Sequence, residues 1–158
     1  MNSAEDVPTG IYTLGHSNHS REKFLALLTQ QQIKMVVDVR SKPFSAYHPQ
    51  FNRDTFKAWL GENGIEYLHL PVLGGMNDIE TTDPKFVEAM QKVSELGTQT
   101  SLAMVCSERD PKQCHRSLKL TPWLLQKSDH VVKHILPDGR VEVADYQADL
   151  FSHSGAQP

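Results

Sequence analysis

The chain has 158 residues, of which 39% are apolar and 22% are charged, and its formal net charge at pH 7 is -3. This length suits a single domain with one hydrophobic core, and the composition is that of an average soluble globular protein. The slightly acidic balance does not favour a nucleic-acid-binding surface, and no apolar run approaches the ~18 residues that a membrane span needs, so no membrane partner is expected.

The two ends of the chain differ in character from its centre. Residues 1–9 and 152–158 are polar and predict flexible tails around a single domain over residues 10–151. The acidic N-terminus MNSAEDVPTG is unlike a secretory signal, so we expect a cytoplasmic protein. In a reducing cytosol, Cys106 and Cys114 are expected to be thiols, ligands or catalysts rather than a structural disulfide.

The first part of the chain predicts two strands, each followed by a helix. IYTLGH (11–16) predicts a strand, and Ser20 then caps a helix with one apolar stripe. KMVVDVR (34–40) is β-branched and almost continuously apolar, which is typical of a strand buried on both faces. A loop with two prolines follows, and a short helix that begins near Asn52 is expected to end at residues 63–64.

The middle of the chain repeats this alternation. IEYLHLPVL (65–73) predicts the third strand, which Gly74-Gly75 closes in a tight turn that requires positive φ. Asp83-Pro84 combines a helix cap with a first-turn proline and predicts a helix that ends at Gly97. SLAMVC (101–106) predicts a fourth buried strand.

The last part of the chain completes the predicted fold. Asp110-Pro111 repeats the cap signature and predicts a helix to about Lys127, which Pro122 is expected to kink or divide. HVVKHIL (130–136) predicts the fifth strand, and GRVEVADY (139–146) a possible C-terminal β-hairpin. Strands separated by helices of about ten residues predict an α/β fold with a three-layer, mostly parallel sheet of about five strands.

Reactive polar residues gather at the predicted carboxyl ends of the strands. Ligands of open parallel sheets bind outside these ends, so the gathering predicts a site on this edge. Turns are polar in any case, and capping explains Ser17, Ser41 and Asp138 equally well. In chain order the strand-end residues are His16, Ser17, Asp38, Arg40, Ser41, His69, Gly74, Gly75, Cys106, Ser107, Glu108, His134, Asp138 and Gly139.

Cys106 ends a buried strand just before the predicted helix start at Asp110. The dipole of that helix can lower the pKa of the thiol by about one unit, whereas Glu108 and Asp110 raise it, so only a nearby arginine makes Cys106 a nucleophile. Packing as a small buried side chain is the equal alternative. Cys114 shares a helical stripe with Leu118, which favours packing against the sheet.

His115 and Arg116 follow Cys114 but project about 100° and 200° away from it around the helix. Arg116 can clamp a phosphate or a carboxylate, or form a surface salt bridge with Glu108 or Asp110. A metal site is a second possibility, because cysteine and histidine bind zinc and ferrous iron. The seven-residue gap between the cysteines is not a zinc-knuckle spacing, so no residue is assigned to a metal and the cofactor stays unknown. The candidate ligands are Cys106, Cys114, His115, His16 and His69.

Five motifs together resemble the bacterial and archaeal domain of unknown function 488 family: TLGHS (13–17), VVDVRSKPFS (36–45), LGG (73–75), CSERDPKQCHR (106–116) and VKHILPDG (132–139). The resemblance implies a fold and a set of motif residues rather than a reaction, because the family name leaves the activity open. The DVR end of the second strand and the strand-end cysteine are also similar to rhodanese and cysteine-phosphatase sites, from which Arg116 departs by its distance along the chain from Cys106. By the resemblance the motif residues are His16, Ser17, Asp38, Arg40, Cys106, Glu108, Cys114, His115 and Arg116.

Two hypotheses on function follow. The first is an enzyme that acts on a small anionic or nucleotide-like ligand at the carboxyl edge of the sheet. In it Arg40 and Arg116 clamp the anion, and Cys106 is nucleophile or ligand. Its proposed catalytic residues are Cys106, Glu108, Asp38 and His16, and its proposed ligand-binding residues are Ser17, Arg40, Gly74, Gly75, Cys114, His115 and Arg116.

The second hypothesis is a non-catalytic binding or regulatory module, in which Asp38, Arg40, Glu108 and Arg116 satisfy one another. A nucleic-acid partner is a further, weaker alternative, because HPQFNRDTFKAW (48–59) mixes aromatic and basic residues that can stack and contact phosphates. An amphipathic helix explains Phe56, Trp59 and Leu60 better, which leaves Tyr47, His48 and Arg53 as contacts at the edge.

Overall fold

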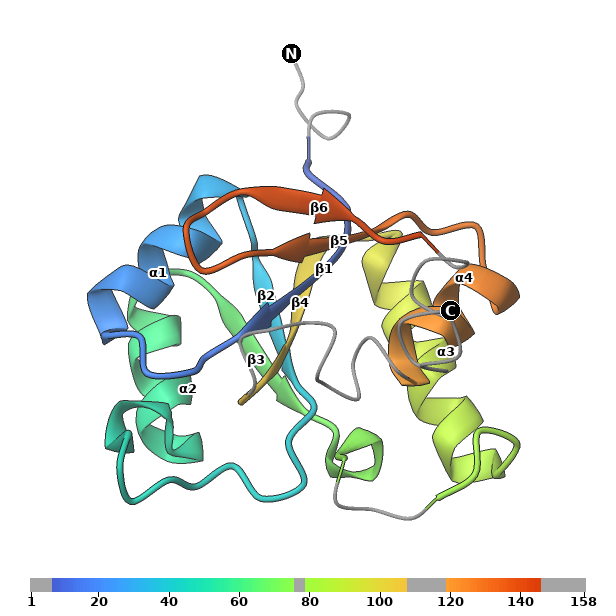
Figure 1. Cartoon of the computed structure of the whole chain (residues 1–158), viewed down its shortest axis with the longest axis horizontal. Helices are drawn as coiled ribbons and strands as arrows, with labels where there is room; N and C mark the ends of the chain where they lie inside the picture. The colour runs from blue at the N-terminus through green and yellow to red at the C-terminus, as the bar shows by residue number, and fades with distance from the viewer. Residues whose placement is uncertain (1–6, 76–78, 108–118, 146–158) are drawn as a thin grey trace, which may run out of the picture.

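The computed structural model describes residues 7–75, 79–107 and 119–145 of the chain. They form one six-stranded sheet in the order β3-β2-β4-β1-β5-β6, parallel throughout except for the antiparallel pair β5–β6 (Figure 1). This confirms the predicted α/β fold with its C-terminal hairpin. The strands are β1 (Gly10–Gly15), β2 (Met35–Asp38), β3 (Glu66–His69), β4 (Ser101–Cys106), β5 (Val132–Ile135) and β6 (Val141–Val143).

The helices cover the two faces of the sheet in pairs, so that the domain has three layers. α1 and α2 lie on one side of the sheet and α3 and α4 on the other (Figure 1). The helices are α1 (Arg21–Gln30), α2 (Arg53–Glu62), α3 (Pro84–Gly97) and α4 (Thr121–Lys127), and two 3-10 turns are η2 (Pro49–Phe51) and η3 (Pro71–Leu73). None of the described helices is long and apolar enough to cross a membrane.

Each face of the sheet carries its own hydrophobic core. The α1–α2 core contains Phe24, Leu28, Phe51, Phe56, Trp59, Ala103 and Val105. The α3–α4 core contains Phe86, Met90, Val93, Leu102, Met104, Cys106, Leu120 and Leu124. The residues of β4 alternate between the two cores, and all six are buried, as a central parallel strand requires. Burial of one such large side chain stabilises the fold by about 1.5–3 kcal/mol.

Caps and turns explain where most elements begin and end. The Ser20 hydroxyl accepts a hydrogen bond from the amide of Lys23, and the Asp83 carboxylate accepts one from the amide of Lys85. These two bonds satisfy amides that the first turns of α1 and α3 leave without helical partners. Gly64 has a φ of +74° just after α2, which confirms the predicted end of that helix.

One predicted strand differs from the structure, and one predicted helix agrees with it at its proline. The third strand ends at His69 rather than at residue 73, because Pro71 begins the turn η3. Lys119 and Leu120 are π-helical and α4 begins directly after them, so the helical geometry changes just before Pro122, which lies in the first turn of α4; this agrees with the expected division at the proline. The start predicted at Asp110 and the domain end predicted at residue 151 lie outside the described residues.

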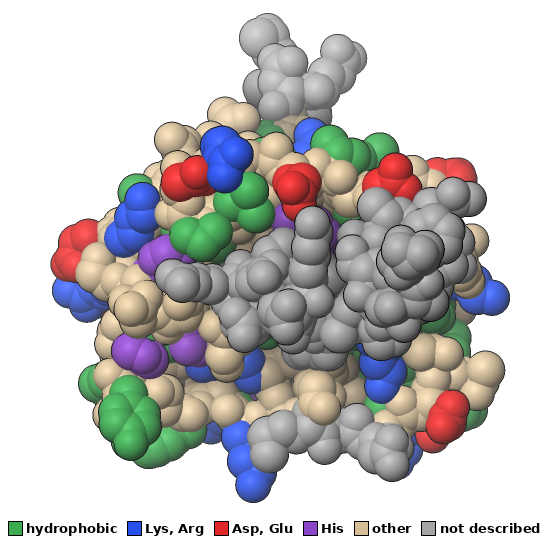
Figure 2. All heavy atoms as spheres, viewed as in Figure 1, with side chains coloured by type: hydrophobic (Ala, Val, Ile, Leu, Met, Phe, Trp, Pro, Cys, Tyr) green, Lys and Arg blue, Asp and Glu red, His purple; other side chains and the backbone are tan. Residues whose placement is uncertain are grey.

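The exposed surface carries charges of both signs. In the view of Figure 2, acidic and basic side chains are interspersed over the described residues rather than gathered in one large patch. This distribution agrees with the small net charge of -3.

Candidate functional site

The carboxyl ends of β1 and β4 lie side by side at the middle of the sheet. Their pairing continues past the strands, because the amide of His16 donates to the Cys106 carbonyl and the amide of Ser17 donates to the Ser107 carbonyl, both at 2.8 Å. β1 leads to α1 on one face, whereas β4 leads toward α4 on the other. Connections that leave neighbouring strands toward opposite faces open a crevice in which ligands of parallel sheets bind.

The sheet register separates the candidate cysteine from the candidate histidine. Gly15 pairs with Cys106, and partners in parallel strands project to the same face. Because successive residues alternate, His16 projects to the opposite face. Cys106 is 3% exposed in the α3–α4 core, and the His16 ring stacks on Phe51 of the α1–α2 core at a centroid distance of 4.6 Å. The two side chains therefore lie on different faces of the sheet.

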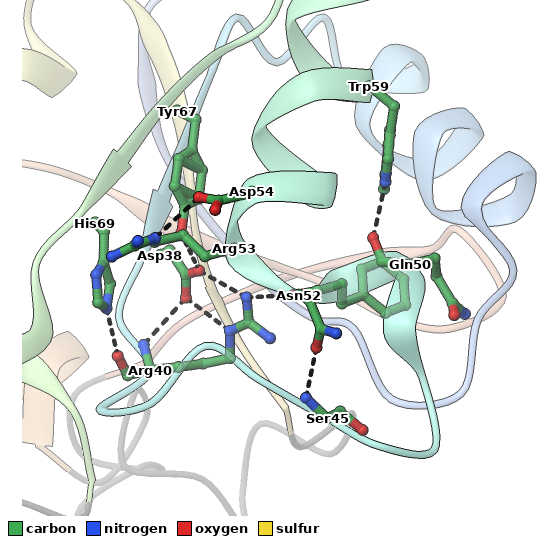
Figure 3. Close-up of polar contacts among 11 residues, drawn as sticks. Asp38, Arg40, Ser45, Gln50, Asn52, Arg53, Asp54, Trp59, Tyr67 and His69 are labelled. Carbon is green, nitrogen blue, oxygen red and sulfur yellow. Dashed lines mark hydrogen bonds and ion pairs between the residues drawn. The ribbon is translucent and has the colours of Figure 1, made fainter.

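Asp38 and Arg40 form a buried ion pair (Figure 3). Asp38 pairs with Val105 of the α1–α2 core, so the ion pair lies on the same face of the sheet as His16. The Asp38 carboxylate accepts hydrogen bonds from the Arg40 amide (3.2 Å), Nε (2.8 Å) and Nη2 (2.7 Å), and from the Tyr67 hydroxyl (2.6 Å). Two oxygens that accept four hydrogen bonds have little capacity left for a ligand. Burial and the Asp38 charge raise the pKa of Tyr67 far above its usual value, so this hydroxyl stays a donor.

Arg40 also holds the segment that follows β2. Its Nη2 donates to the Phe51 carbonyl at 2.7 Å, and its own carbonyl accepts from Nε2 of His69 at 2.8 Å. The guanidinium is 5% exposed, and its third nitrogen, Nη1, has no hydrogen-bond partner among the residues described. Arg40 therefore links the ends of β2 and β3 to the 3-10 turn η2, and the two hydrogens of its Nη1 have no acceptor among the described residues.

His16 has a fixed tautomer. Its Nδ1 lies 2.9 Å from the Ser17 carbonyl, which can only accept, so Nδ1 carries the proton and Nε2 carries the lone pair in the neutral ring. Burial, together with the positive charge of Arg40, lowers the pKa of His16 from 6.5 to about 4. The ring is consequently neutral at pH 7. Nε2 has no hydrogen-bond partner within the described part of the chain.

His16 lines an open depression of about 540 Å³ at the carboxyl ends of β1 and β4. We refer to it as the strand-end depression. Its described lining residues are His16, Ser17, Asn18, Phe44, Ser45, His48 and Ser107. Ser17 has a φ of +46°, a left-handed conformation that a serine adopts at a cost of about 1–3 kcal/mol. Such strain persists only where the surroundings impose it, and here it places the Ser17 carbonyl against the imidazole.

The segment between β2 and α2 forms one wall of the depression. The Asn52 side-chain oxygen accepts from the Ser45 amide at 2.6 Å, and the Ser45 hydroxyl accepts from the His48 amide at 3.0 Å. The His48 ring lies edge-on to His16 at a centroid distance of 6.4 Å. These bonds fix a wall of short polar side chains beside the imidazole.

The predicted ligand-binding glycines have a structural reason for their type. Gly74 has a φ of -71°, and Gly75 also lacks positive φ, so the expected positive-φ turn is wrong. A Cβ at Gly74 would collide with the side chain and backbone of Ser41, so the requirement is close approach of two backbones. Neither glycine lines the strand-end depression.

Four predicted site residues lie outside the described residues: Glu108, Cys114, His115 and Arg116. Within the described ranges, no three histidine, cysteine or acidic side chains gather as a metal site would need. Sequence reasoning missed Phe44 and Ser45, and it named His48 only as a possible nucleic-acid contact. The loop that carries these residues has no hydrophobic periodicity in its sequence. Its position just after a predicted strand was the only indication that it could contribute to a site.

A larger cavity of about 940 Å³ lies between α3 and α4, on the opposite face of the sheet. Its described lining includes Gln91, Glu95, Lys119 and Trp123, and it contains none of the described site residues predicted from the sequence. Lys119 is already engaged, because its ammonium donates to the Ile79 carbonyl and lies over the Phe86 ring. The strand-end depression, although smaller, combines the crevice position with an imidazole nitrogen that no described residue binds, and we regard it as the candidate site.

Comparison with known protein families gives one family-level result. Residues 20–82 and 78–120 match the model of a family described as domain of unknown function DUF488. The matched region contains Asp38, Arg40 and Cys106, begins after His16, and covers more than half of the 158-residue chain. Neither the curated proteins nor the solved structures give a significant match to the chain.

Proposed function

The chain belongs to the domain of unknown function DUF488 family, and we propose that it is an enzyme that binds a small anionic ligand in the strand-end depression, where Nε2 of His16 accepts a hydrogen bond from the ligand. One observation carries the proposal: in a polar depression at a strand crevice, a neutral imidazole with a fixed tautomer has a second nitrogen that lacks a partner among the described residues. A neutral imidazole whose Nδ1 proton is fixed offers Nε2 as a hydrogen-bond acceptor.

The pKa of His16 defines what kind of partner Nε2 prefers. Because the ring is neutral at pH 7, Nε2 accepts a hydrogen bond and does not donate one. A ligand that still carries an acidic O–H, such as dihydrogen phosphate, matches this acceptor. Sulfate has the same shape but no O–H at neutral pH, so it lacks the matching donor.

The anionic character of the ligand is supported by the charges near His16. The Arg40 charge lowers the pKa of His16 and the Asp38 charge raises it, and the effect of Arg40 is the larger of the two. Hydroxyl groups of Ser17, Ser45 and Ser107 surround the depression, and none of its described lining residues is acidic. Arg40 is not among the described residues that line the depression, so it favours an anion through its positive charge and not through a direct contact.

The other predicted catalytic residues receive different roles in this proposal. Asp38 holds Arg40 and acts as a positioning residue, because its oxygens are occupied. Cys106 packs in the α3–α4 core and does not meet the ligand. Glu108, Cys114, His115 and Arg116 lie outside the described residues and have no part in the proposal.

A non-catalytic module is the second candidate, and the saturated Asp38–Arg40 pair favours it. A carboxylate whose two oxygens are both occupied can hold strand ends together without any ligand. This candidate predicts that His16 serves packing alone. Phosphate would then bind no more tightly than sulfate, and replacing the imidazole by another ring would not affect anion binding.

The proposal is tested by titrating the full chain with inorganic phosphate and sulfate at pH 7, with the His16 imidazole signals followed by NMR. We expect phosphate to bind more tightly than sulfate and to shift these signals. His16→Phe retains the stack on Phe51 but removes Nε2, so the preference for phosphate should disappear. Cys106→Ala is the control on the opposite face and should leave both affinities unchanged. Equal affinity for the two anions, or loss of phosphate binding in Cys106→Ala alone, would refute the proposal.

A further inference from the structure

We infer that the ligand of the strand-end depression is a nucleoside monophosphate, whose base stacks on Phe44 while its phosphate lies near His16. The inference rests on the proposed function for the anionic part of the ligand and adds the aromatic part. Phe44 is the purely hydrocarbon side chain among the described residues that line the depression, and it is 64% exposed. A large ring held in water leaves apolar area that a flat partner would bury.

The backbone around Phe44 is held firmly. The Phe44 amide donates to the Lys42 carbonyl at 2.8 Å, and the Arg53 amide donates to the Pro43 carbonyl at 2.9 Å. The neighbouring Ser45 amide is bound by the Asn52 side chain, as described above. The ring is thus presented by a fixed loop and not by a frayed end. A preorganised ring stacks on a ligand with little loss of backbone entropy.

The depression has two chemically different sides, and a nucleotide has the same two parts. The strand-end side offers the His16 imidazole and serine hydroxyls, which suit a phosphate and the hydroxyls of a sugar. The loop side offers the face of the Phe44 ring, on which any of the nucleobases can stack because each has a π-face. A volume of about 540 Å³ lies within the range of small-molecule and cofactor sites.

The position of Tyr47 on the same loop helps to distinguish a mononucleotide ligand from a nucleic-acid strand. Its side chain is 89% exposed but does not line the depression. In Figure 2 hydrophobic side chains protrude beside histidines at the lower left, over the segment between β2 and α2 (Figures 1 and 2). A bound strand would use both aromatic rings as successive stacking platforms, whereas a mononucleotide reaches Phe44 only. The slightly acidic surface favours the mononucleotide, because a strand needs many cationic phosphate contacts.

The experiment compares three probes on the full chain by calorimetry: inorganic phosphate, ribose 5-phosphate and adenosine 5′-monophosphate. Stacking of one base on an aromatic side chain corresponds to about tenfold or more in affinity. We therefore expect adenosine 5′-monophosphate to bind at least about tenfold more tightly than ribose 5-phosphate. Phe44→Ala should make these two affinities equal, and Tyr47→Ala, the matched control, should leave both unchanged. Both side chains are exposed, so neither substitution removes core packing.

Each contrary result identifies its own cause. If ribose 5-phosphate and adenosine 5′-monophosphate bind equally to the unmodified chain, base stacking is wrong, while the proposed anion site stands. If none of the three probes binds, the proposed function fails and the inference fails with it. If Tyr47→Ala weakens binding of adenosine 5′-monophosphate as much as Phe44→Ala does, the base does not stack specifically on Phe44 and the inference is overturned.

Discussion

Replacing His16 should change how the stability of the fold depends on pH. In the folded chain the pKa of His16 is about 4, against 6.5 for an ordinary histidine. Between these values the unfolded chain binds a proton that the folded chain does not, so the stability contributed by His16 is lost as the pH falls from 6.5 toward 4. Linkage gives a loss of about 3 kcal/mol at pH 4 relative to pH 7 from this group alone. Such a loss is a large part of a typical domain stability of about 5–15 kcal/mol.

Urea denaturation of the full chain at a series of pH values from 7 to 4 measures this effect. His16→Gln removes the titrating ring, so the difference in unfolding free energy between the variant and the unmodified chain should change by about 3 kcal/mol across the series, in favour of the variant at low pH. Ser45→Ala is the control, because it alters the same depression without a titrating group and should give a curve parallel to the unmodified one. Parallel curves for His16→Gln as well, or an NMR titration of His16 near 6.5, would show that the burial argument is wrong.

Two further predictions concern the supports of the site. Asp38→Asn leaves the buried Arg40 charge uncompensated and should lower the unfolding free energy by about 3–5 kcal/mol. Tyr67→Phe removes only one hydrogen bond to the carboxylate and should lower it by about 1.5–3 kcal/mol. Equal losses for the two variants in urea denaturation would contradict the charge argument. Gly74→Ala should lower the melting temperature because its Cβ meets the Ser41 backbone, while Gly61→Ala, which faces open space in α2, should raise stability by about 0.4–1 kcal/mol. A Gly74→Ala variant as stable as the unmodified chain would show that the backbones at Gly74 and Ser41 can move apart at little cost in free energy.

Local sequence patterns predicted the elements of the fold well, because caps and apolar runs act over a few residues. SLAMVC matches β4 residue for residue, and the cap at Asp83 begins α3 as expected. The run 65–73 overshot β3 because apolarity does not distinguish a buried strand from a buried 3-10 turn, and Leu73 is buried in the latter. Strand order was beyond reach, since the pairing of β4 between β2 and β1 depends on contacts remote in sequence.

The candidate site was predictable only as an edge of the sheet. Alternation along one strand places Asp38 and Arg40 on one face, so their pairing follows from a two-residue spacing. The separation of His16 from Cys106 depends on the pairing of Gly15 with Cys106, which no local pattern reveals. Phe44, Ser45 and His48 reach the depression through the fold of an irregular loop. Its bonds to Asn52 and Arg53 become visible only in the folded chain.

The DVR segment (38–40) influences the candidate site indirectly, through its contact with Phe51. Asp38 fixes the Arg40 guanidinium, and Arg40 in turn binds the Phe51 carbonyl at 2.7 Å. The Phe51 ring then supports the His16 ring in a stack with an interplanar angle of 22°. A buried ion pair is weak as a source of stability, because desolvation offsets much of its attraction. Its value here is orientation: the pair holds the Phe51 backbone, and the Phe51 ring in turn supports the His16 ring whose Nε2 lacks a partner among the described residues.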